Sequence, residues 1–195
     1  MARSLAELLS FARLLNSFRN VERVVWANGT ERMENDVEHS YALAMLGWYL
    51  AADTNLDASK VVAYALVHDL VEVYAGDTFF YTTDVSARES KARREAAAAA
   101  RLRDEFPEFP DLHHSIEAYE RREDPEARFV YALDKIQPVI NIYLDAGRTW
   151  KTHNITLDML YAMKMDKVAI SSEIEHYFKE IVSLLRRESS DLFNT

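Results

Sequence analysis

The stretch Tyr64-Ala-Leu-Val-His-Asp-Leu-Val-Glu-Val-Tyr-Ala-Gly-Asp77 sets ligand-type residues into an apolar helical repeat. The apolar positions of the repeat, which begins just before this stretch, are Val61, Val62, Ala65, Leu66, Leu70 and Val73. On one helix the side chains of His68, Asp69 and Glu72 would lie within about 100° of one another. Gly76 is a helix stop, and Asp77 follows it. This pattern suits a metal site beside an acid or base; the alternative is an ordinary amphipathic helix whose polar edge faces water.

The composition indicates a helical protein. The chain has 195 residues, a length that suits one domain over 1–195 with a buried core. It contains only four Gly and four Pro, which favours long helices over a turn-rich sheet protein. We therefore expect an all-α, single-domain helical bundle.

Charge and cysteine content exclude several classes of protein. There is no cysteine, so disulfides and thiolate metal sites are excluded. The net charge of −9 argues against a protein that binds a nucleic-acid polymer through a general basic surface. A small phosphorylated substrate needs only a local cation, and a divalent metal ion can be that cation. Apolar runs are too short for a membrane span or an export signal, so the cytoplasm is the expected location.

The other helices follow from capping residues and apolar spacing. We expect them over 5–19, from a cap at Asn35 onward, from about Leu56 through the opening stretch, and over 86–106, 113–121, 126–145, 156–171 and 172–187. The connections are 19–30, the aromatic loop 77–85 and the polar loop 145–156. The aromatic loop contains Phe79, Phe80 and Tyr81, and either covers a site or packs down. Tyr41 and Trp48 are expected in the core, and His113 and His114 on the surface.

Two further ligand-type residues stand out. His39 falls in the first turn of the helix that Asn35 caps, where the positive helix end favours a neutral imidazole. Asp134 lies inside an apolar helical sequence, and Pro138 cannot donate a hydrogen bond to its carbonyl. Two imidazoles and two carboxylates, from His39, His68, Asp69 and Asp134, fit one divalent ion such as Mn, Co, Fe, Ni, Zn or Mg. Such an ion polarises a phosphoryl oxygen and lowers the pKa of water. Glu72 would then be the general acid or base.

The order of these residues resembles the HD-domain metal-dependent phosphohydrolases, whose pattern is His, then His-Asp, then a distant Asp. Three segments resemble the 5′-deoxynucleotidase branch: Glu34-Asn-Asp-Val-Glu-His-Ser40, His68-Asp-Leu-Val-Glu-Val-Tyr-Ala-Gly-Asp77 and Asp134-Lys-Ile-Gln-Pro-Val-Ile140. The resemblance covers roughly Phe18 to Trp150, the motif-bearing core of about 18–150.

This resemblance implies a role for each matching residue. It makes His39, His68, Asp69 and Asp134 the metal ligands. Glu72 is then the catalytic carboxylate, and Asp77 a catalytic-site residue that contacts the substrate at its sugar. Arg23 and Trp26 resemble the Arg and Trp that hold the phosphate and the sugar. Some members have these two residues adjacent, whereas two residues separate them here, so Arg19 and Arg32 remain competitors for the phosphate.

The expected activity is release of phosphate from (deoxy)nucleoside 5′-monophosphates. One alternative is a nucleoside triphosphate or alarmone (pyro)phosphohydrolase, and another is a non-catalytic nucleotide sensor on the same fold. A triphosphate needs several cations. The motifs are accompanied by Arg19, Arg23, Arg32 and Lys135 but by no dense basic cluster, which favours monophosphates. The resemblance also implies a homodimer, and the apolar stripes of the first and last helices agree with it. The roles of Arg148, Trp150 and His153, in the pocket, at a subunit contact or neither, stay open.

Overall fold

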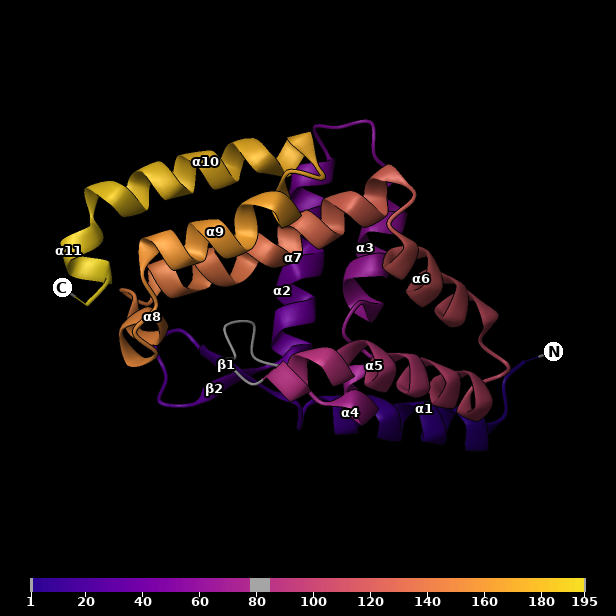
Figure 1. Cartoon of the computed structure of the whole chain (residues 1–195). Helices are drawn as coiled ribbons and strands as arrows, with labels where there is room; N and C mark the ends of the chain where they lie inside the picture. Colours follow the sequence, from indigo (N-terminus) through magenta and orange to yellow (C-terminus); the bar gives the residue numbers. More distant parts are fainter. Residues whose placement is uncertain (1, 78–84, 195) are drawn as a thin grey trace.

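The computed structural model describes residues 2–77 and 85–194 and is almost entirely helical (Figure 1). In chain order, the elements of these ranges are α1 (Leu5–Phe18), β1 (Glu22–Trp26), β2 (Met33–Asn35), α2 (Asp36–Ala51), α3 (Ala58–Val67), α4 (Glu72–Ala75), α5 (Val85–Glu105), α6 (Pro110–Arg121), α7 (Pro125–Leu144), α8 (Arg148–Thr152), α9 (Leu157–Val168), α10 (Ser172–Arg187) and α11 (Ser189–Leu192). The prediction of an all-α fold is confirmed. None of the described helices combines the length and the apolar character that a membrane span requires.

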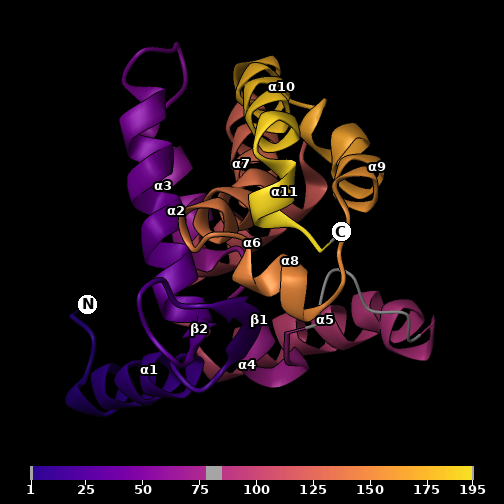
Figure 2. The ribbon, with the colours of Figure 1, turned by 90° about the vertical axis from the view of Figure 1, so that its left-hand side faces the viewer.

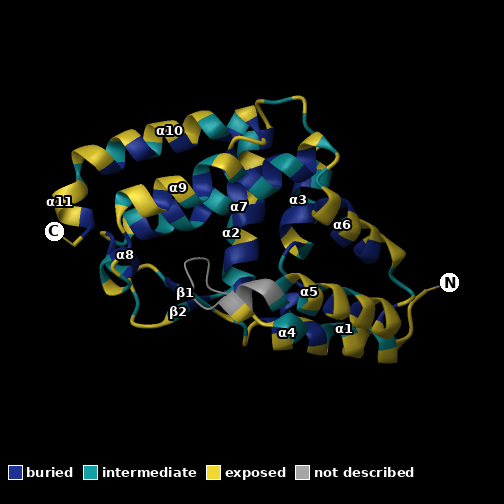
Figure 3. Cartoon of the chain, viewed as in Figure 1, coloured by how far each residue is buried: buried dark blue, intermediate teal, exposed yellow. Residues whose placement is uncertain are grey.

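Helix α7 is the centre of the larger of two apolar clusters. It packs against α2, α3, α6, α9 and α10. Its residues Phe129, Val130 and Leu133 are almost fully buried. The apolar stripe of α10 faces this cluster, and its other side is exposed (Figure 3). The predicted stripe of the last helix is therefore core rather than free surface.

A second apolar cluster lies between α1, α4, α5 and α6. Ala65 of α3 belongs to the first cluster, and Leu70 and Val71 belong to the second. The chain thus crosses from one cluster to the other between Ala65 and Leu70, in the stretch that contains His68 and Asp69. This crossing places two polar side chains between the clusters, where they can meet polar groups from other elements.

The predicted helix starts are confirmed at three caps. Ser4 and Asn35 each form a capping box with the residue three positions on, Glu7 and Glu38. Asp124 accepts a hydrogen bond from the backbone N–H of Ala127 at the start of α7. Such starts are predictable because capping depends on residues within one turn.

The expectation of one continuous helix through the opening stretch is wrong. Helix α3 ends at Val67, and Glu72 begins the separate short helix α4. Between them the backbone makes tight bonds three residues apart, such as Glu72 N–H to the carbonyl of Asp69 at 2.8 Å. Apolar residues on both sides of the break are buried in one cluster or the other, so the apolar spacing continues across it. Periodicity alone therefore does not reveal where the helix ends.

Other expectations are also corrected. The connection 19–30 contains strand β1, which pairs antiparallel with β2 and contacts α8 in the polar loop 145–156 (Figure 2). Tyr41 and Trp48 are exposed, because the buried side of α2 is formed by Leu43, Ala44 and Gly47. His113 is buried and hydrogen-bonds the carbonyl of Phe106 at 2.7 Å. The helix expected over 126–145 is confirmed, since α7 continues through Pro138. The aromatic residues Phe79, Phe80 and Tyr81 lie outside the described residues.

Candidate metal centre

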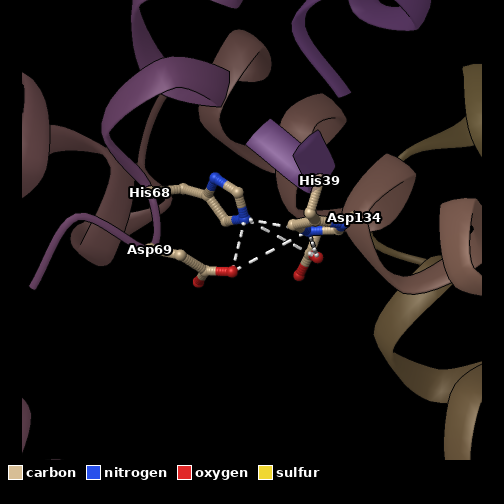
Figure 4. A group of neighbouring side chains, drawn as sticks. All are labelled: His39, His68, Asp69 and Asp134. Carbon is tan, nitrogen blue, oxygen red and sulfur yellow. Dashed lines mark hydrogen bonds and ion pairs between the residues drawn. The ribbon is translucent and has the colours of Figure 1, made fainter. Parts of the chain in front are cut away.

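Four side chains from distant parts of the chain meet at one point (Figure 4). His39 comes from α2, His68 and Asp69 from the turn after α3, and Asp134 from the middle of α7. One ligand atom of each lies within 4.8 Å of those of the other three. The Nε2 atoms of His39 and His68 are 3.3 Å apart, and His39 Nε2 is 3.1 Å from Asp134 Oδ1. His68 Nε2 is 2.9 Å from Asp69 Oδ2.

The local structure aims both imidazoles at this point. His68 Nδ1 hydrogen-bonds the carbonyl of Ala65 at 2.8 Å, so Nδ1 is the donor and Nε2 presents its lone pair. Burial lowers the pKa of His39 to about 4, with Arg23 adding to the effect, so its imidazole is neutral at pH 7. Neutral imidazole is the form that binds metals.

The two carboxylates stay ionised although Asp134 is buried and Asp69 is partly buried. Burial alone would raise the pKa of Asp69, but His68 and Arg23 outweigh it and hold the pKa below its usual range. Lys135 and the two histidines likewise hold the pKa of Asp134 well below its usual range. Burial would lower the pKa of His68, and Asp69 raises it instead. Two anionic oxygens and two inward lone pairs in a dry site fit a borderline or hard divalent cation.

Glu72 lies beside this cluster at the start of α4 and is buried. Its Oε1 is 3.4 Å from Lys91 Nζ of α5, which also pairs with Glu95 at 3.0 Å. Burial, with the nearby carboxylates of Asp69 and Asp77, raises the pKa of Glu72 to about 11. A cation at the cluster would oppose this shift.

Arg23 reaches the cluster from β1. Its Nη1 donates to Asp36 Oδ1 and to Asp69 Oδ2, each at 2.9 Å. Its Nε is 3.7 Å from Glu34 Oε2. Asp36 and Glu34 are both buried, and their place in the site is not predicted from the sequence. Asp36 could have been found from the sequence, because it is a charged residue directly after the helix cap Asn35.

Among the described residues, Asp36, Asp69 and Glu72 form a second group whose carboxylate oxygens lie close enough together to hold a metal ion. It shares Asp69 with the first group. Arg23 bonds two of its three members, so a guanidinium already balances these carboxylates.

One cavity joins the cluster to an apolar end. Among the described residues, the polar side chains that line it are Arg23, Asp69, Glu72, Asp77, Lys91, Asp134, Lys135, Thr149 and Lys164. Its apolar lining consists of Val24, Val25, Pro138, Val139, Ile142, Trp150 and Ile155. A polar, charged end next to an apolar end suits a small molecule with a charged group and an apolar or aromatic group.

Only some of the predicted substrate-binding residues line this cavity in the described structure. Arg23 and Asp77 line it, whereas Trp26 is not among the described residues that do. The ring of Trp26 lies 4.6 Å from the guanidinium of Arg148. Arg32 pairs with Glu38 at the surface. Arg19 lines a separate groove near α1, so of the three competing arginines Arg23 alone lines the cavity in the described structure.

The cavity contains cationic side chains beyond those that accompany the motifs, balanced by the carboxylates of Asp69, Glu72, Asp77 and Asp134. Arg23, Lys91, Lys135 and Lys164 all line the cavity. Lys91 and Lys164 are more than 10 residues from any motif in sequence, so the motifs do not point to them. Lys164 has a recognisable signal, because it occupies the same helical stripe as Leu160 and Val168.

Comparison with known proteins fits this geometry. The family model described as HD domain matches residues 15–175, a range that contains all four clustered residues. The chain belongs to the HD-domain family. The resemblance seen in the sequence is thereby confirmed.

Similar proteins include named 5′-deoxynucleotidases and a solved structure. A protein from Bos taurus named 5′-deoxynucleotidase HDDC2 is 32% identical over 141 residues, which are 71% of this chain and 67% of that protein. The Mus musculus protein of the same name is 31% identical over 138 residues, 69% of this chain and 68% of that protein. A solved structure described as a predicted metal-dependent phosphohydrolase, from Magnetospirillum magnetotacticum MS-1, has 31% identity and a TM-score of 0.80. The match covers 95% of this chain and 94% of that chain.

Proposed function

We propose that this protein is a metal-dependent phosphohydrolase that releases phosphate from deoxyribonucleoside 5′-monophosphates. The observation that carries the proposal is the meeting of two histidines and two aspartates beside a cavity that Glu72 and Arg23 line. The 5′-deoxynucleotidase names of the relatives support the substrate class.

In this proposal His39, His68, Asp69 and Asp134 hold one divalent ion. When bound, the ion supplies a Lewis acid that polarises a phosphoryl oxygen and lowers the pKa of water. The identity of the ion, among Mn, Co, Fe, Ni, Zn and Mg, is left to experiment.

The remaining roles fall to residues of the same cavity. Glu72 moves a proton, since it is a buried carboxylate beside the cluster and Lys91 fixes one of its oxygens. Arg23 binds the phosphate through its guanidinium, which is already fixed by Asp36. Asp77 accepts a hydrogen bond from the sugar. Trp26 packs against Arg148 and is not among the described residues that line the cavity, so its contact with the sugar rests on the resemblance alone.

A second candidate is hydrolysis of nucleoside triphosphates or alarmones. The four cationic side chains of the cavity favour it, because a longer phosphate chain needs several positive charges. A non-catalytic nucleotide sensor is the third, and the intact Glu72 beside the cluster argues against it.

A phosphate-release screen separates these candidates. Metal-stripped protein is supplied with Mn, Co, Mg or Zn and given dAMP, AMP, dATP and ATP. We expect orthophosphate and nucleoside from dAMP, with less product from AMP. Release of pyrophosphate or triphosphate from dATP with dAMP untouched would replace the monophosphate assignment. Binding of dAMP without any product would support the sensor.

We also propose a cytoplasmic homodimer. The outer side of α2 exposes Tyr41, Met45, Trp48 and Tyr49, which together form an apolar surface. Light scattering should give a dimer mass, and Trp48→Glu should reduce it to a monomer. Tyr161→Glu, a matched change at an exposed aromatic residue of α9, should leave the dimer intact. A monomeric wild-type protein at micromolar concentration would rule the dimer out.

A further inference from the structure

Lys164 is a charged residue in a buried helical stripe. On α9 it follows Leu160 by one turn and precedes Val168 by one turn, and both of these residues are fully buried. Lys164 itself is only 4% exposed. A lysine at such a position is uncommon, because burying an ammonium group carries a large desolvation cost. Leucine or methionine would fill the stripe without that cost.

Lys164 lines the cavity beside the metal cluster. Its Nζ donates to the backbone carbonyl of Lys135 at 2.7 Å. This bond joins α9 to α7 one residue after Asp134. The bond fixes the position of the ammonium group relative to α7.

Other cations surround the same position. Arg23 and Lys135 line the cavity together with Lys164. Burial, followed by repulsion from Lys135, lowers the pKa of Lys164 to about 7, and Asp134 opposes the shift. Arg23 and Lys135 are paired with carboxylates, including those of Asp69 and Asp134. Lys164 adds a third positive charge for an anionic group in the cavity.

We propose that Lys164 is a phosphate-binding residue of this cavity, whose ammonium contacts a phosphoryl oxygen of the substrate together with Arg23. This inference rests on the proposed function for the identity of the substrate, but not for the anion that binds. The ligand chemistry is a phosphate dianion. It is either the ester group of a monophosphate, the terminal group of a triphosphate, or free orthophosphate as the product.

Orthophosphate binding tests the inference without turnover. The probe is orthophosphate added to Mn-loaded protein, and binding is measured by calorimetry and by the shift in melting temperature. Lys164→Met keeps the length and fills the stripe with an apolar group. Lys179→Met changes an exposed lysine of α10, which lines a groove that none of the four clustered residues borders, and is the matched control. We expect Lys164→Met to weaken orthophosphate binding about ten- to hundredfold, as loss of a charge-assisted hydrogen bond does. Mn binding should be unchanged in both variants.

Steady-state kinetics with dAMP and dATP then identify the phosphate concerned. For a monophosphate contact, Lys164→Met raises KM for dAMP about tenfold and weakens inhibition by orthophosphate by a similar factor. An effect confined to dATP assigns the contact to the terminal phosphate of a triphosphate.

The inference and the proposed function fail in different ways. If Lys164→Met binds orthophosphate as the wild type does, or the wild type binds none, Lys164 is a structural tether between α9 and α7. A lower melting temperature of Lys164→Met with unchanged orthophosphate binding would also assign Lys164 that structural role and overturn the inference. If the wild type hydrolyses no nucleotide yet loses orthophosphate binding on Lys164→Met, the inference stands and the proposed function does not.

Discussion

At Asp134 a buried carboxylate lies between a histidine and a lysine. Its Oδ1 is 3.1 Å from His39 Nε2, and its Oδ2 pairs with Lys135 Nζ. We expect Asp134→Ala to reduce Mn binding below detection, because one of two anionic ligands is lost. The variant should stay folded, since Lys135 is partly exposed and can reach water.

Calorimetry with Mn and a melting curve measure both effects. Asp166→Ala, at an exposed position of α9, is the control and should bind Mn normally. Undiminished Mn binding by Asp134→Ala would show that the ion is held elsewhere.

Glu72 is expected to act in turnover and not in metal binding. It lies beside the cluster but is not one of its four members. Glu72→Gln should lower kcat about 10²–10⁴-fold, the usual cost of losing a general acid or base, with Mn affinity retained. Glu95→Gln removes the other carboxylate that contacts Lys91 and should keep most activity. Wild-type turnover by Glu72→Gln would reduce Glu72 to a structural partner of Lys91.

The positions of individual site residues are predictable from the sequence only in part. The order of the four clustered residues along the chain identifies them, and the structure brings them together. Periodicity alone does not predict this meeting, because His39 and Asp134 are 95 residues apart. The environment of Trp26 is not predictable, since it depends on Arg148 of helix α8, which forms where the sequence indicates only a polar loop.

At the scale of elements, Asp124 connects two helices. It caps α7, accepts a hydrogen bond from the Tyr64 hydroxyl at 2.8 Å and pairs with Lys60 of α3 at 3.1 Å. Asp124→Ala should lower the free energy of unfolding by about 1–2 kcal/mol, as loss of an N-cap does. Asp158→Ala, in the first turn of α9, should cost less than about 0.5 kcal/mol.

The same carboxylate predicts a pH dependence. Burial opposes the change, but the bonds from Ala127, Tyr64 and Lys60 lower the pKa of Asp124 below its usual value. The folded state therefore binds the proton more weakly than the unfolded state. The stabilisation is present above about pH 4 and is lost as the pH falls below it. Denaturant unfolding of wild type and Asp124→Ala should converge in that range; a difference that persists unchanged to about pH 2 would contradict the assignment.

Substitution of Gly147 and of Gly29 by Ala tests the close contact between α11 and the start of α8. Both have positive φ, at 74° and 72°. A Cβ at Gly147 would overlap the backbone of Leu192, whereas a Cβ at Gly29 meets open space. Gly29→Ala should cost about 1 kcal/mol of backbone strain, and Gly147→Ala about 1–3 kcal/mol more from the overlap. Equal melting temperatures for the two variants would mean that α11 does not hold this position.

Helix boundaries are predictable where a cap or a proline marks them and not where the cause is tertiary. The break after Val67 lies where the chain passes from the first apolar cluster to the second, between Ala65 and Leu70. The sequence indicates a connection where strand β1 forms. The strand has only five residues and depends on its pairing with β2, so its local sequence does not predict it.

At the scale of the whole molecule, apolar stripes do not distinguish core from free surface. Helix α10 buries its stripe, while α1 buries Leu14 and Phe18 and leaves Leu5 and Leu8 exposed. Trp48 is expected in the core and is instead exposed. The stripes of α1 and α10 and the exposure of Trp48 are not predictable for the same reason. The spacing of apolar residues along a helix does not show whether they pack into the core of the chain or face a second copy.

The most direct test is orthophosphate release from dAMP by metal-stripped protein before and after Mn is restored, with Asp134→Ala measured in parallel. A phosphohydrolase that depends on the His39, His68, Asp69 and Asp134 cluster should be inactive without metal and should regain activity with about one Mn per chain. Asp134→Ala should stay inactive at the same Mn concentration. Equal orthophosphate release from the stripped protein, or from Asp134→Ala, would contradict a catalytic metal at this cluster.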